Sequence, residues 1–140
     1  MCGISGIINF KGNINKNIVE EINFQIQHRG PDHNCVVKNN FSALGYVRLK
    51  IIDLSDTSNQ PFISKSKKIK IFYNGEIYNS SELKKLYFQN LKFKSSGDGE
   101  VLLYLYEKFG ISFLDKIKGM FSIVICDEEN SRIFLVRDRF

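Results

Sequence analysis

The sequence predicts an α+β fold in which helices pack against antiparallel β-sheets. Apolar segments that alternate as strands do are joined in pairs by short polar turns, and segments with helical periodicity lie between these pairs. No internal repeat or linker divides the 140 residues, of which 43% are hydrophobic and 25% charged. This composition and length are typical of one globular domain, so residues 1–140 are treated as a single domain.

The chain begins with a predicted strand and helix. Residues 2–10 alternate small and apolar side chains and end at a Lys-Gly-Asn turn, as a first strand would. Isoleucine then recurs every four residues from Ile14 to Ile26, which predicts the apolar stripe of an amphipathic helix. Pro31 cannot continue a helix, so residues 28–34 are expected to form a loop.

Three further strands and a short helix are predicted in the middle of the chain. Strands at 35–38 and 41–48 are joined by an Asn-Asn turn, because asparagine tolerates the left-handed conformation. A strand at 69–73 is expected to run into a turn at Asn74-Gly75. Asn79 followed by Glu82 has the spacing of a capping box, which predicts a helix over 80–90.

A helix and a closing hairpin are predicted for the last third of the chain. The helix covers about 99–109 and stops at Gly110. Strands at 119–127 and 132–138, separated by Glu-Glu-Asn-Ser, form the hairpin. This hairpin is apolar on both faces and therefore expects cover on both. If cover is missing, we expect poor stability and association through the sheet edge.

The composition argues against several classes of function. The net charge of +5 comes mainly from lysine residues spread along the chain. The densest lysine run, residues 65–70, is typical of a solvated hairpin turn. Since a nucleic-acid interface needs a clustered basic patch, no nucleic-acid partner is expected. No membrane span and no signal peptide are predicted. Three cysteines without close pairing favour free thiols in the cytoplasm, and two histidines outside any Cys/His cluster predict no metal site.

Cys2 is the first candidate for chemistry. Methionine is normally removed when the next side chain is small, which would leave one residue with both a thiol and a free α-amine. An unperturbed α-amine has a pKa of about 7.7–8.0 and a cysteine thiol about 8.5. The amine can then serve as general base for the thiol, with no histidine required. A structural or incidental role is the alternative.

Three more positions carry both a structural and a functional interpretation. Asn74-Gly75 is either a hairpin turn or an oxyanion hole built from an amide side chain and a backbone N–H. Arg48, inside an apolar stretch, forms either a structural ion pair or a bidentate contact with a carboxylate. Asp98 either caps the helix that follows it or accepts hydrogen bonds from an amino group.

Together these positions resemble the glutaminase part of glutamine-dependent asparagine synthases, an N-terminal-nucleophile family. The resemblance covers essentially the whole chain. It rests on motifs in the family's order and spacing: CGISG at the N-terminus, HRGPD (28–32), RLKIID (48–53), Gln60-Pro61, NGEIYN (74–79), Asp98-Gly99-Glu100, GMF (119–121) and RDRF (137–140). It implies a four-layer αββα sandwich of antiparallel sheets, incomplete at the C-terminus, and hydrolysis of L-glutamine to glutamate and ammonia.

The resemblance also implies a role for each matching residue. Cys2 would be the nucleophile, and Asn74 with Gly75 the oxyanion hole. Arg48 would hold the substrate α-carboxylate. Asp98 would hold the α-amino group. The substrate pocket would also be lined by Leu49, Lys50, Ile51, Ile52, Gly75 and Glu76. No catalytic role is expected for His28 or Arg29, which would stabilise the loop.

Departures from the family pattern bear on function. Tyr46 stands where many relatives carry histidine, and Gly99 where many carry threonine or serine. Relatives continue past RDRF into an ATP-dependent synthetase domain, so ATP and magnesium are expected only there and no cofactor is expected in this domain. That domain, in the same or a separate chain, is the expected partner. The alternatives to an active glutaminase are an inactive truncated remnant and a non-catalytic glutamine-binding domain.

Overall fold

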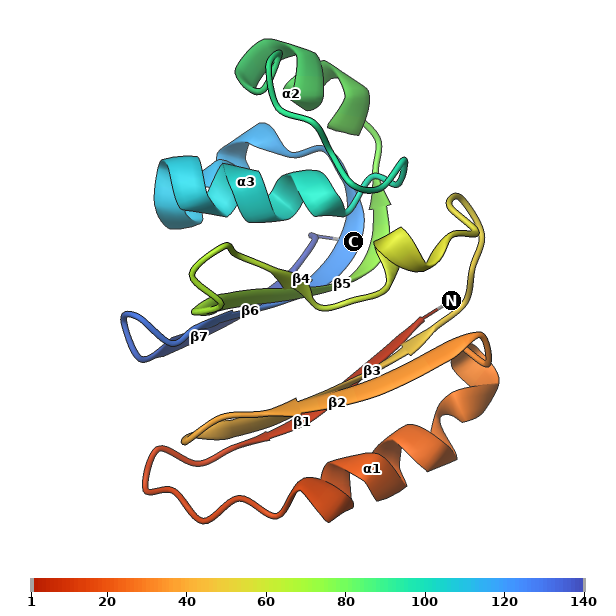
Figure 1. Cartoon of the computed structure of the whole chain (residues 1–140), viewed down its shortest axis with the longest axis vertical. Coiled ribbons are helices and arrows are strands. Elements are labelled where there is room, and N and C mark those ends of the chain that lie inside the picture. The colour runs from red at the N-terminus through yellow and green to blue at the C-terminus, as the bar shows by residue number, and fades with distance from the viewer. Residues whose placement is uncertain (1, 140) are drawn as a thin grey trace. The chain divides into compact units, whose positions relative to one another are not determined.

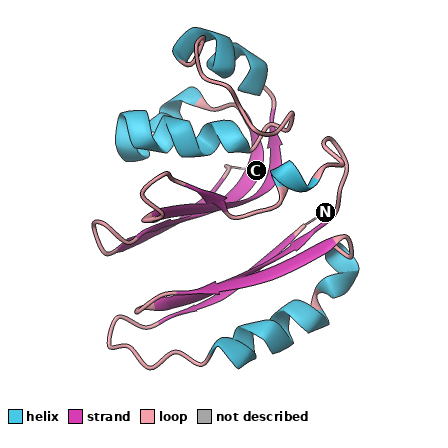
Figure 2. Ribbon diagram, in the orientation of Figure 1, coloured by secondary structure: helices cyan, strands magenta, loops and turns pink. Residues whose placement is uncertain are grey.

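In a computed structural model, residues 2–139 are described, and the chain divides into two compact units, Met1–Ile51 and Ile52–Phe140. These are called the N-terminal unit and the C-terminal unit below. Each contains an antiparallel sheet with helix packed against it (Figures 1 and 2). The predicted α+β class is therefore confirmed, whereas the stacking of the two sheets remains a prediction.

The N-terminal unit is a three-stranded antiparallel sheet, in the order β1-β3-β2, with one helix packed on it. Its elements are β1 (Gly3–Ile8), α1 (Lys16–Gln25), the 3-10 turn Gln27–Arg29, β2 (His33–Lys38) and β3 (Ser42–Arg48). The predicted elements are present. The loop expected over 28–34 is shorter, however, because His33 already pairs with Arg48 across the sheet.

The buried face of α1 differs from the predicted isoleucine stripe. Ile18 and Ile22 are exposed, with 44% and 36% of their surface accessible, and Val19 and Asn23 are fully buried instead. Asn23 is satisfied there: its Oδ1 accepts from the Ser5 hydroxyl at 2.5 Å, and its Nδ2 donates to Asn34 Oδ1 at 2.7 Å. A periodicity argument counts only apolar residues and so misses a helix face that is held to its sheet by a buried amide.

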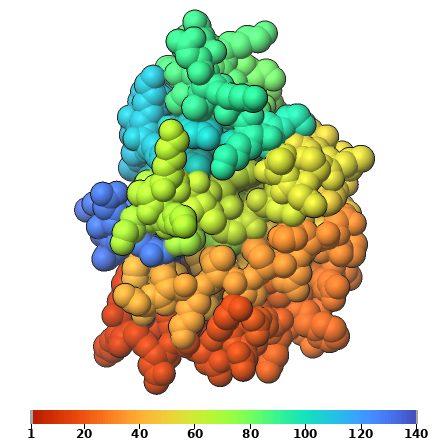
Figure 3. Space-filling model, viewed as in Figure 1, coloured from red at the N-terminus to blue at the C-terminus, as the bar shows by residue number. Residues whose placement is uncertain are grey.

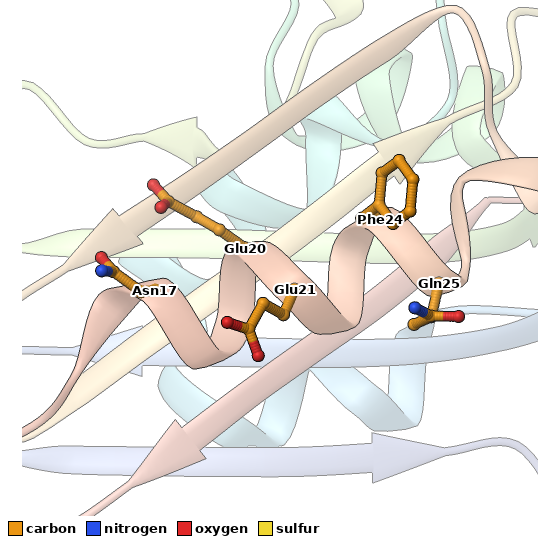
Figure 4. A pocket seen from close by; sticks show the side chains of 5 residues that line it. All are labelled: Asn17, Glu20, Glu21, Phe24 and Gln25. Atoms are coloured by element: carbon orange, nitrogen blue, oxygen red, sulfur yellow. The ribbon is translucent and has the colours of Figure 1, made fainter.

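The outer face of α1 carries a shallow surface depression. It is lined by Asn17, Glu20, Glu21, Phe24 and Gln25 (Figure 4). Phe24 is 69% exposed, so this face is open to solvent. The depression contains none of the residues predicted for the functional site.

The C-terminal unit is a four-stranded antiparallel sheet in the order β4-β5-β6-β7. Its helices α2 and α3 lie on one face of that sheet, and the large apolar core lies beneath α3 (Figure 2). The elements are the 3-10 turn Asp56–Ser58, β4 (Phe62–Ile63), β5 (Ile69–Ile77), α2 (Ser80–Tyr87), α3 (Glu100–Phe109), the 3-10 segment Gly110–Lys116, β6 (Gly119–Asp127) and β7 (Arg132–Arg137).

The predicted turn at Asn74-Gly75 is wrong, because β5 runs straight through both residues. Asn74 pairs with Ser122 and Gly75 with Phe121 in the antiparallel ladder to β6. Gly75 has φ +151°, and a Cβ added to it would overlap the carbonyl oxygen of Met120. Glycine is therefore needed here for close approach of two strands rather than for a tight turn.

The helix ends are also partly different from those predicted. Asn79 precedes α2 without capping it: its Nδ2 donates to the Lys116 carbonyl at 2.9 Å, and its Oδ1 accepts from Lys118 N at 2.8 Å. Asn79 thus joins the start of α2 to residues 116–118, the segment that leads into β6. The predicted end of α3 at Gly110 is correct, since Gly110 adopts φ +57° at the C-cap.

The lysine-rich segment is a turn on the surface, as predicted (Figure 3). Residues 65–68 are exposed between β4 and β5, and the Ser64 N–H donates to the Ile69 carbonyl across the turn at 3.0 Å. Lys70, the last lysine of the run, lies in β5 and forms an ion pair with Glu128.

The closing hairpin is present as β6 and β7. Ile123 and Ile125 of β6 are buried in the core, whereas Leu135 of β7 is 70% exposed. Among residues 2–139, β7 pairs only with β6. Within the described residues β7 is therefore an edge strand with one exposed leucine, and the association through this edge remains a prediction.

Candidate active site

The sulfur of Cys2 contacts the backbone at the end of β3. Its Sγ accepts from the Leu49 N–H at 3.4 Å and lies 3.7 Å from the Leu49 carbonyl, to which the thiol can donate. Cys2 is half-buried and directly precedes β1, where Gly3 pairs with Val47. The sheet register thus fixes the nucleophile candidate opposite the Arg48 end of β3.

The HRGPD segment supports this end of the sheet. Arg29 Nε donates to the Cys2 carbonyl at 3.2 Å, and Asp32 Oδ2 accepts from Lys50 N at 2.8 Å. The Asp32 N–H donates to the Arg48 carbonyl at 3.0 Å. A Cβ on Gly30 would overlap the backbone of Val47 and Arg48, so glycine permits this close packing. The sequence motif suggested a stabilising role for Arg29, and the contact with Cys2 itself could not be foreseen.

Arg48 is placed at the same end of the sheet as Cys2. It is the last residue of β3 and is only 5% exposed. Its side chain lies on the same strand face as Tyr46. Burial raises the pKa of Tyr46 far above its usual range, and the positive charge of Arg48 offsets part of that rise. The following segment is more open: Leu49 and Lys50 are half-buried, and Ile51 is 67% exposed. Ile52, the first residue of the C-terminal unit, is 58% exposed.

Asp98 is oriented by two donors from β5. Its Oδ2 accepts from the Tyr73 hydroxyl at 2.6 Å and from the Ile77 N–H at 2.7 Å. Burial, followed by the hydrogen bond to Asp98, raises the pKa of Tyr73 far above its usual range, so its hydroxyl stays a donor. Asp98 does not cap α3, whose N-cap is Gly99. Within residues 2–139 no donor reaches Oδ1 of Asp98, which leaves that oxygen for an external donor.

Asn74, Gly75 and Glu76 lie in sequence on β5, between the two residues that hold Asp98. Asn74 and Gly75 are half-buried and Glu76 is exposed. No hydrogen bond from the Asn74 amide is found to any of residues 2–139, so its N–H donors are available to a ligand. The structure thus brings the predicted residues together in two groups, Cys2 with 48–51 in the N-terminal unit and 74–76 with Asp98 in the C-terminal unit.

Gly99 has a packing role that the sequence did not reveal. A Cβ at this position would lie 2.7 Å from Tyr73 Cδ1 and 2.8 Å from Phe62 Cε2. The tyrosine ring that orients Asp98 thus occupies the space that a larger residue 99 would need. A side chain at residue 99 would require the rings of Tyr73 and Phe62 to move.

Asp53 is a further residue that holds the site and was missed as such. Its Oδ1 accepts from the N–H and hydroxyl of Ser55, and its Oδ2 accepts from the Ser58 hydroxyl at 2.8 Å and from Ser96 N at 2.9 Å. The carboxylate therefore joins the segment after residue 52 to the loop that precedes Asp98. The motif RLKIID contained this residue, but its partner at Ser96 is 43 positions away.

We expect Asp53→Asn to destabilise the chain by about 2 kcal/mol at pH 7, the size of lost charge-assisted hydrogen bonds. The donors from Ser55 and Ser58, in that order, hold the pKa of Asp53 well below its usual range. A lowered pKa adds stability that is present above about pH 4, the unfolded value, and is lost as pH falls further. Urea melts from pH 7 to pH 2 should show this acid loss in the wild type and a flatter profile in the variant. Asp115→Asn, at an exposed carboxylate, is the control, and equal profiles for all three proteins would contradict the role of Asp53.

Residues 2–139 contain neither a cluster of metal ligands nor a helix that could cross a membrane. Among residues 2–139, no group of three or more His, Cys, Asp or Glu side chains is arranged to hold a metal ion. No helix in that range combines the length and apolar character that a membrane crossing requires.

Comparisons of the sequence with known proteins all indicate one family. A family model described as a glutamine amidotransferase domain matches residues 1–140. Asparagine synthetase [glutamine-hydrolyzing] 2 of Bacillus subtilis is 41% identical over all of this chain and 19% of that protein. A putative asparagine synthetase [glutamine-hydrolyzing] 2 of Methanocaldococcus jannaschii is 39% identical over 99% of this chain and 30% of that protein.

Structural comparison indicates the same fold. The solved structure of glutamine phosphoribosylpyrophosphate amidotransferase from Bacillus subtilis has a TM-score of 0.73 and 22% identity, and the match covers 98% of this chain and 36% of that one. At this level of identity the likeness concerns the fold alone. The chain spans less than a third of the length of the two curated relatives above.

Proposed function

The chain belongs to the glutamine amidotransferase domain family, and we propose that it hydrolyses L-glutamine to glutamate and ammonia with Cys2 as nucleophile. The observation that carries this proposal is the fixed position of the Cys2 sulfur against the Leu49 backbone at the Arg48 end of β3. A nucleophile must be held in one orientation to gain the advantage of proximity.

The proposed reaction needs no group beyond the chain and water. With Met1 removed, the α-amine of Cys2 takes the thiol proton, and the sulfur attacks the carboxamide carbon. The tetrahedral intermediate expels ammonia, which leaves with the proton held by the amine, and a thioester forms. Water then attacks the thioester carbon, glutamate departs, and the thiol is restored. We expect turnover without added ATP or metal.

The remaining residues take the roles that their contacts support. Asn74, whose amide has no partner in residues 2–139, and the Gly75 N–H would donate to the oxyanion. Arg48 would bind the α-carboxylate through a planar fork of donors. Asp98, with Oδ1 left over, would accept from the α-ammonium group. The half-buried to exposed backbone of 49–52, with Glu76, would line the pocket.

We further propose that the ammonia supplies an amidation of the asparagine-synthase type. The support is the similarity to asparagine synthetases named as glutamine-hydrolyzing, of which this chain matches only a part. The ATP-dependent synthetase domain would be the partner, in the same or a separate chain. ATP and magnesium would be needed there.

The proposal is tested with 6-diazo-5-oxo-L-norleucine, which shares the α-amino acid portion of glutamine and alkylates a positioned nucleophile. We expect peptide mapping to find the label on Cys2, and L-glutamine but not D-glutamine to protect against it. Ammonia and glutamate should appear in equal amounts when L-glutamine is added. Label on Cys35 or Cys126 instead, or no protection by L-glutamine, would refute the assignment.

Asp98→Asn separates recognition from reactivity. An amide oxygen in place of Oδ2 keeps the bonds from Tyr73 and Ile77, whereas an NH₂ in place of Oδ1 repels an ammonium group. We expect labelling by the glutamine analogue to slow about 10- to 100-fold, as expected for a lost charged hydrogen bond, and alkylation of Cys2 by iodoacetamide to be unchanged. The matched control is Asp127→Asn, since Asp127 also accepts from a tyrosine, Tyr106, at 2.7 Å. Equal analogue labelling in both variants would remove Asp98 from the pocket.

A further inference from the structure

The Gln60 side chain continues the sheet of the C-terminal unit opposite Tyr73. β4 begins at Phe62, which pairs with Ile71 of β5. In the same antiparallel register, Gln60 comes opposite Tyr73, and there its amide replaces a backbone partner. Its Oε1 accepts from the Tyr73 N–H at 2.6 Å, and its Nε2 donates to the Tyr73 carbonyl at 2.9 Å. Gln60, which is buried, thus fixes the backbone of one residue of β5 by two hydrogen bonds.

The Tyr73 ring is confined as firmly as its backbone. It belongs to the apolar core of the C-terminal unit and is almost fully buried. A Cβ built on Gly99 would lie 2.7 Å from Tyr73 Cδ1, so the ring packs directly against the backbone of residue 99. Side chains in such a close-packed core keep one rotamer. The phenolic oxygen of Tyr73 therefore has one defined position.

Two hydrogen bonds to one oxygen hold the Asp98 carboxylate. The Tyr73 hydroxyl and the Ile77 N–H both donate to Oδ2, at 2.6 Å and 2.7 Å. Turning the carboxylate plane away from this position would lengthen both bonds, whereas a single donor would leave the plane free to turn about it. Oδ1, which no donor among residues 2–139 reaches, is thereby held in one place.

We propose that Tyr73, held by Gln60, is a positioning residue that fixes the Asp98 carboxylate and so makes the site selective for substrates with an α-ammonium group. This inference rests on the proposed role of Asp98 in binding that group. A site built to pair with an N–H group of its substrate rejects an analogue that lacks it, because a polar atom of the site is then left unpaired. Here that atom is Asp98 Oδ1.

The test compares two diazoketones that differ only in the α-amino group. They are 6-diazo-5-oxo-L-norleucine and 6-diazo-5-oxohexanoate, which lacks that group. The rate at which each labels Cys2 is measured by mass spectrometry of its peptide, and the ratio of the two rates is the selectivity. We expect a ratio well above one in wild type and a ratio about tenfold lower in Tyr73→Phe, the scale of one hydrogen bond to a charged group. Alkylation of Cys2 by iodoacetamide should be unchanged, because iodoacetamide carries no ammonium group.

Further variants separate positioning from a general loosening of the fold. Asp98→Asn removes the carboxylate on which Tyr73 acts, so adding Tyr73→Phe to it should cause no further loss of selectivity. Gln60→Glu keeps an acceptor for the Tyr73 N–H but sets an oxygen against the Tyr73 carbonyl, so it should also lower the selectivity. Tyr106→Phe removes another buried hydroxyl, one that donates to Asp127, and should leave the selectivity unchanged.

The possible outcomes distinguish this proposal from the proposed function. Unchanged selectivity in Tyr73→Phe would overturn the proposal, as would equal slowing of both diazoketones, which indicates a general structural effect. Equal labelling of wild type by both reagents, or additive losses in the double variant, would also overturn it. Melting temperatures are recorded for every variant, and Tyr73→Phe, which keeps the ring, decides the outcome if Gln60→Glu does not fold. Failure of 6-diazo-5-oxo-L-norleucine to label Cys2 in wild type would instead overturn the proposed function.

Discussion

Replacing Cys2 by alanine should lower glutamine turnover by about 10⁴-fold or more, the scale at which removal of a nucleophile acts in covalent catalysis. An extra N-terminal residue that resists removal should have the same effect, because it ties up the α-amine that serves as general base. Ammonia release from the purified, correctly processed chain measures both, and intact-mass analysis verifies that Met1 is absent.

Cys35→Ala is the matched control for this result. Cys35 is a half-buried cysteine in the same sheet, and burial raises its pKa to about 11, so it holds almost no thiolate at neutral pH. We expect this variant to keep turnover within about threefold of wild type, since it touches no reacting atom. Undiminished turnover in the N-terminally extended protein would show that the base is another group.

Gly75→Ala should destabilise the chain by about 3 kcal/mol or prevent folding. A Cβ at residue 75 overlaps the Met120 carbonyl and lies 2.7 Å from Phe121 Cα, and φ +151° disfavours any L side chain. Backbone strain of this kind costs about 1–3 kcal/mol, and overpacking typically adds about 1–3 more. Thermal melts followed by circular dichroism measure the loss, and glutamine turnover should disappear with it.

Gly110→Ala separates the cost of backbone strain from the cost of steric overlap. Gly110 also has a positive φ, +57°, but nothing lies within 4 Å of a Cβ built there. With φ +57° and ψ −150°, a region used almost only by glycine, this substitution should cost about 1–3 kcal/mol of backbone strain and no overlap penalty. Equal melting temperatures for the two variants would mean that β5 and β6 do not approach as closely as the register of Gly75 and Phe121 requires.

Much of the fold was predictable because the hydrophobic pattern and turn residues of each segment agree with the burial and backbone conformation that the segment has in the structure. The closing hairpin and the end of α3 at Gly110 follow from alternation and from glycine at a C-cap. The turn expected at Asn74-Gly75 was wrong, since the pairing of β6 continues β5 through that dipeptide. The face of α1 was wrong because Asn23 is buried by partners on β1 and β2, which no helical periodicity encodes.

The motifs identified the site residues, but they did not identify the residues that hold those side chains in place. Cys2, Arg48, Asn74 and Asp98 stand out because their residue types suit the chemistry at the positions where they occur. The bond from Tyr73 to Asp98 joins residues 25 apart in sequence. A single sequence cannot show such contacts, since they arise only when distant strands pair.

The pairing of β1 with β3 alone sets an order of events during synthesis. β1 leaves the ribosome first, yet its only partner among residues 2–139 begins at Ser42. At the usual elongation rate of about 5–20 residues per second, roughly 2–8 seconds pass before that partner exists. During this interval β1 has no strand to pair with. If Met1 is removed as proposed, slower translation of the first forty codons should lengthen the time in which a peptidase reaches an unpaired amino end.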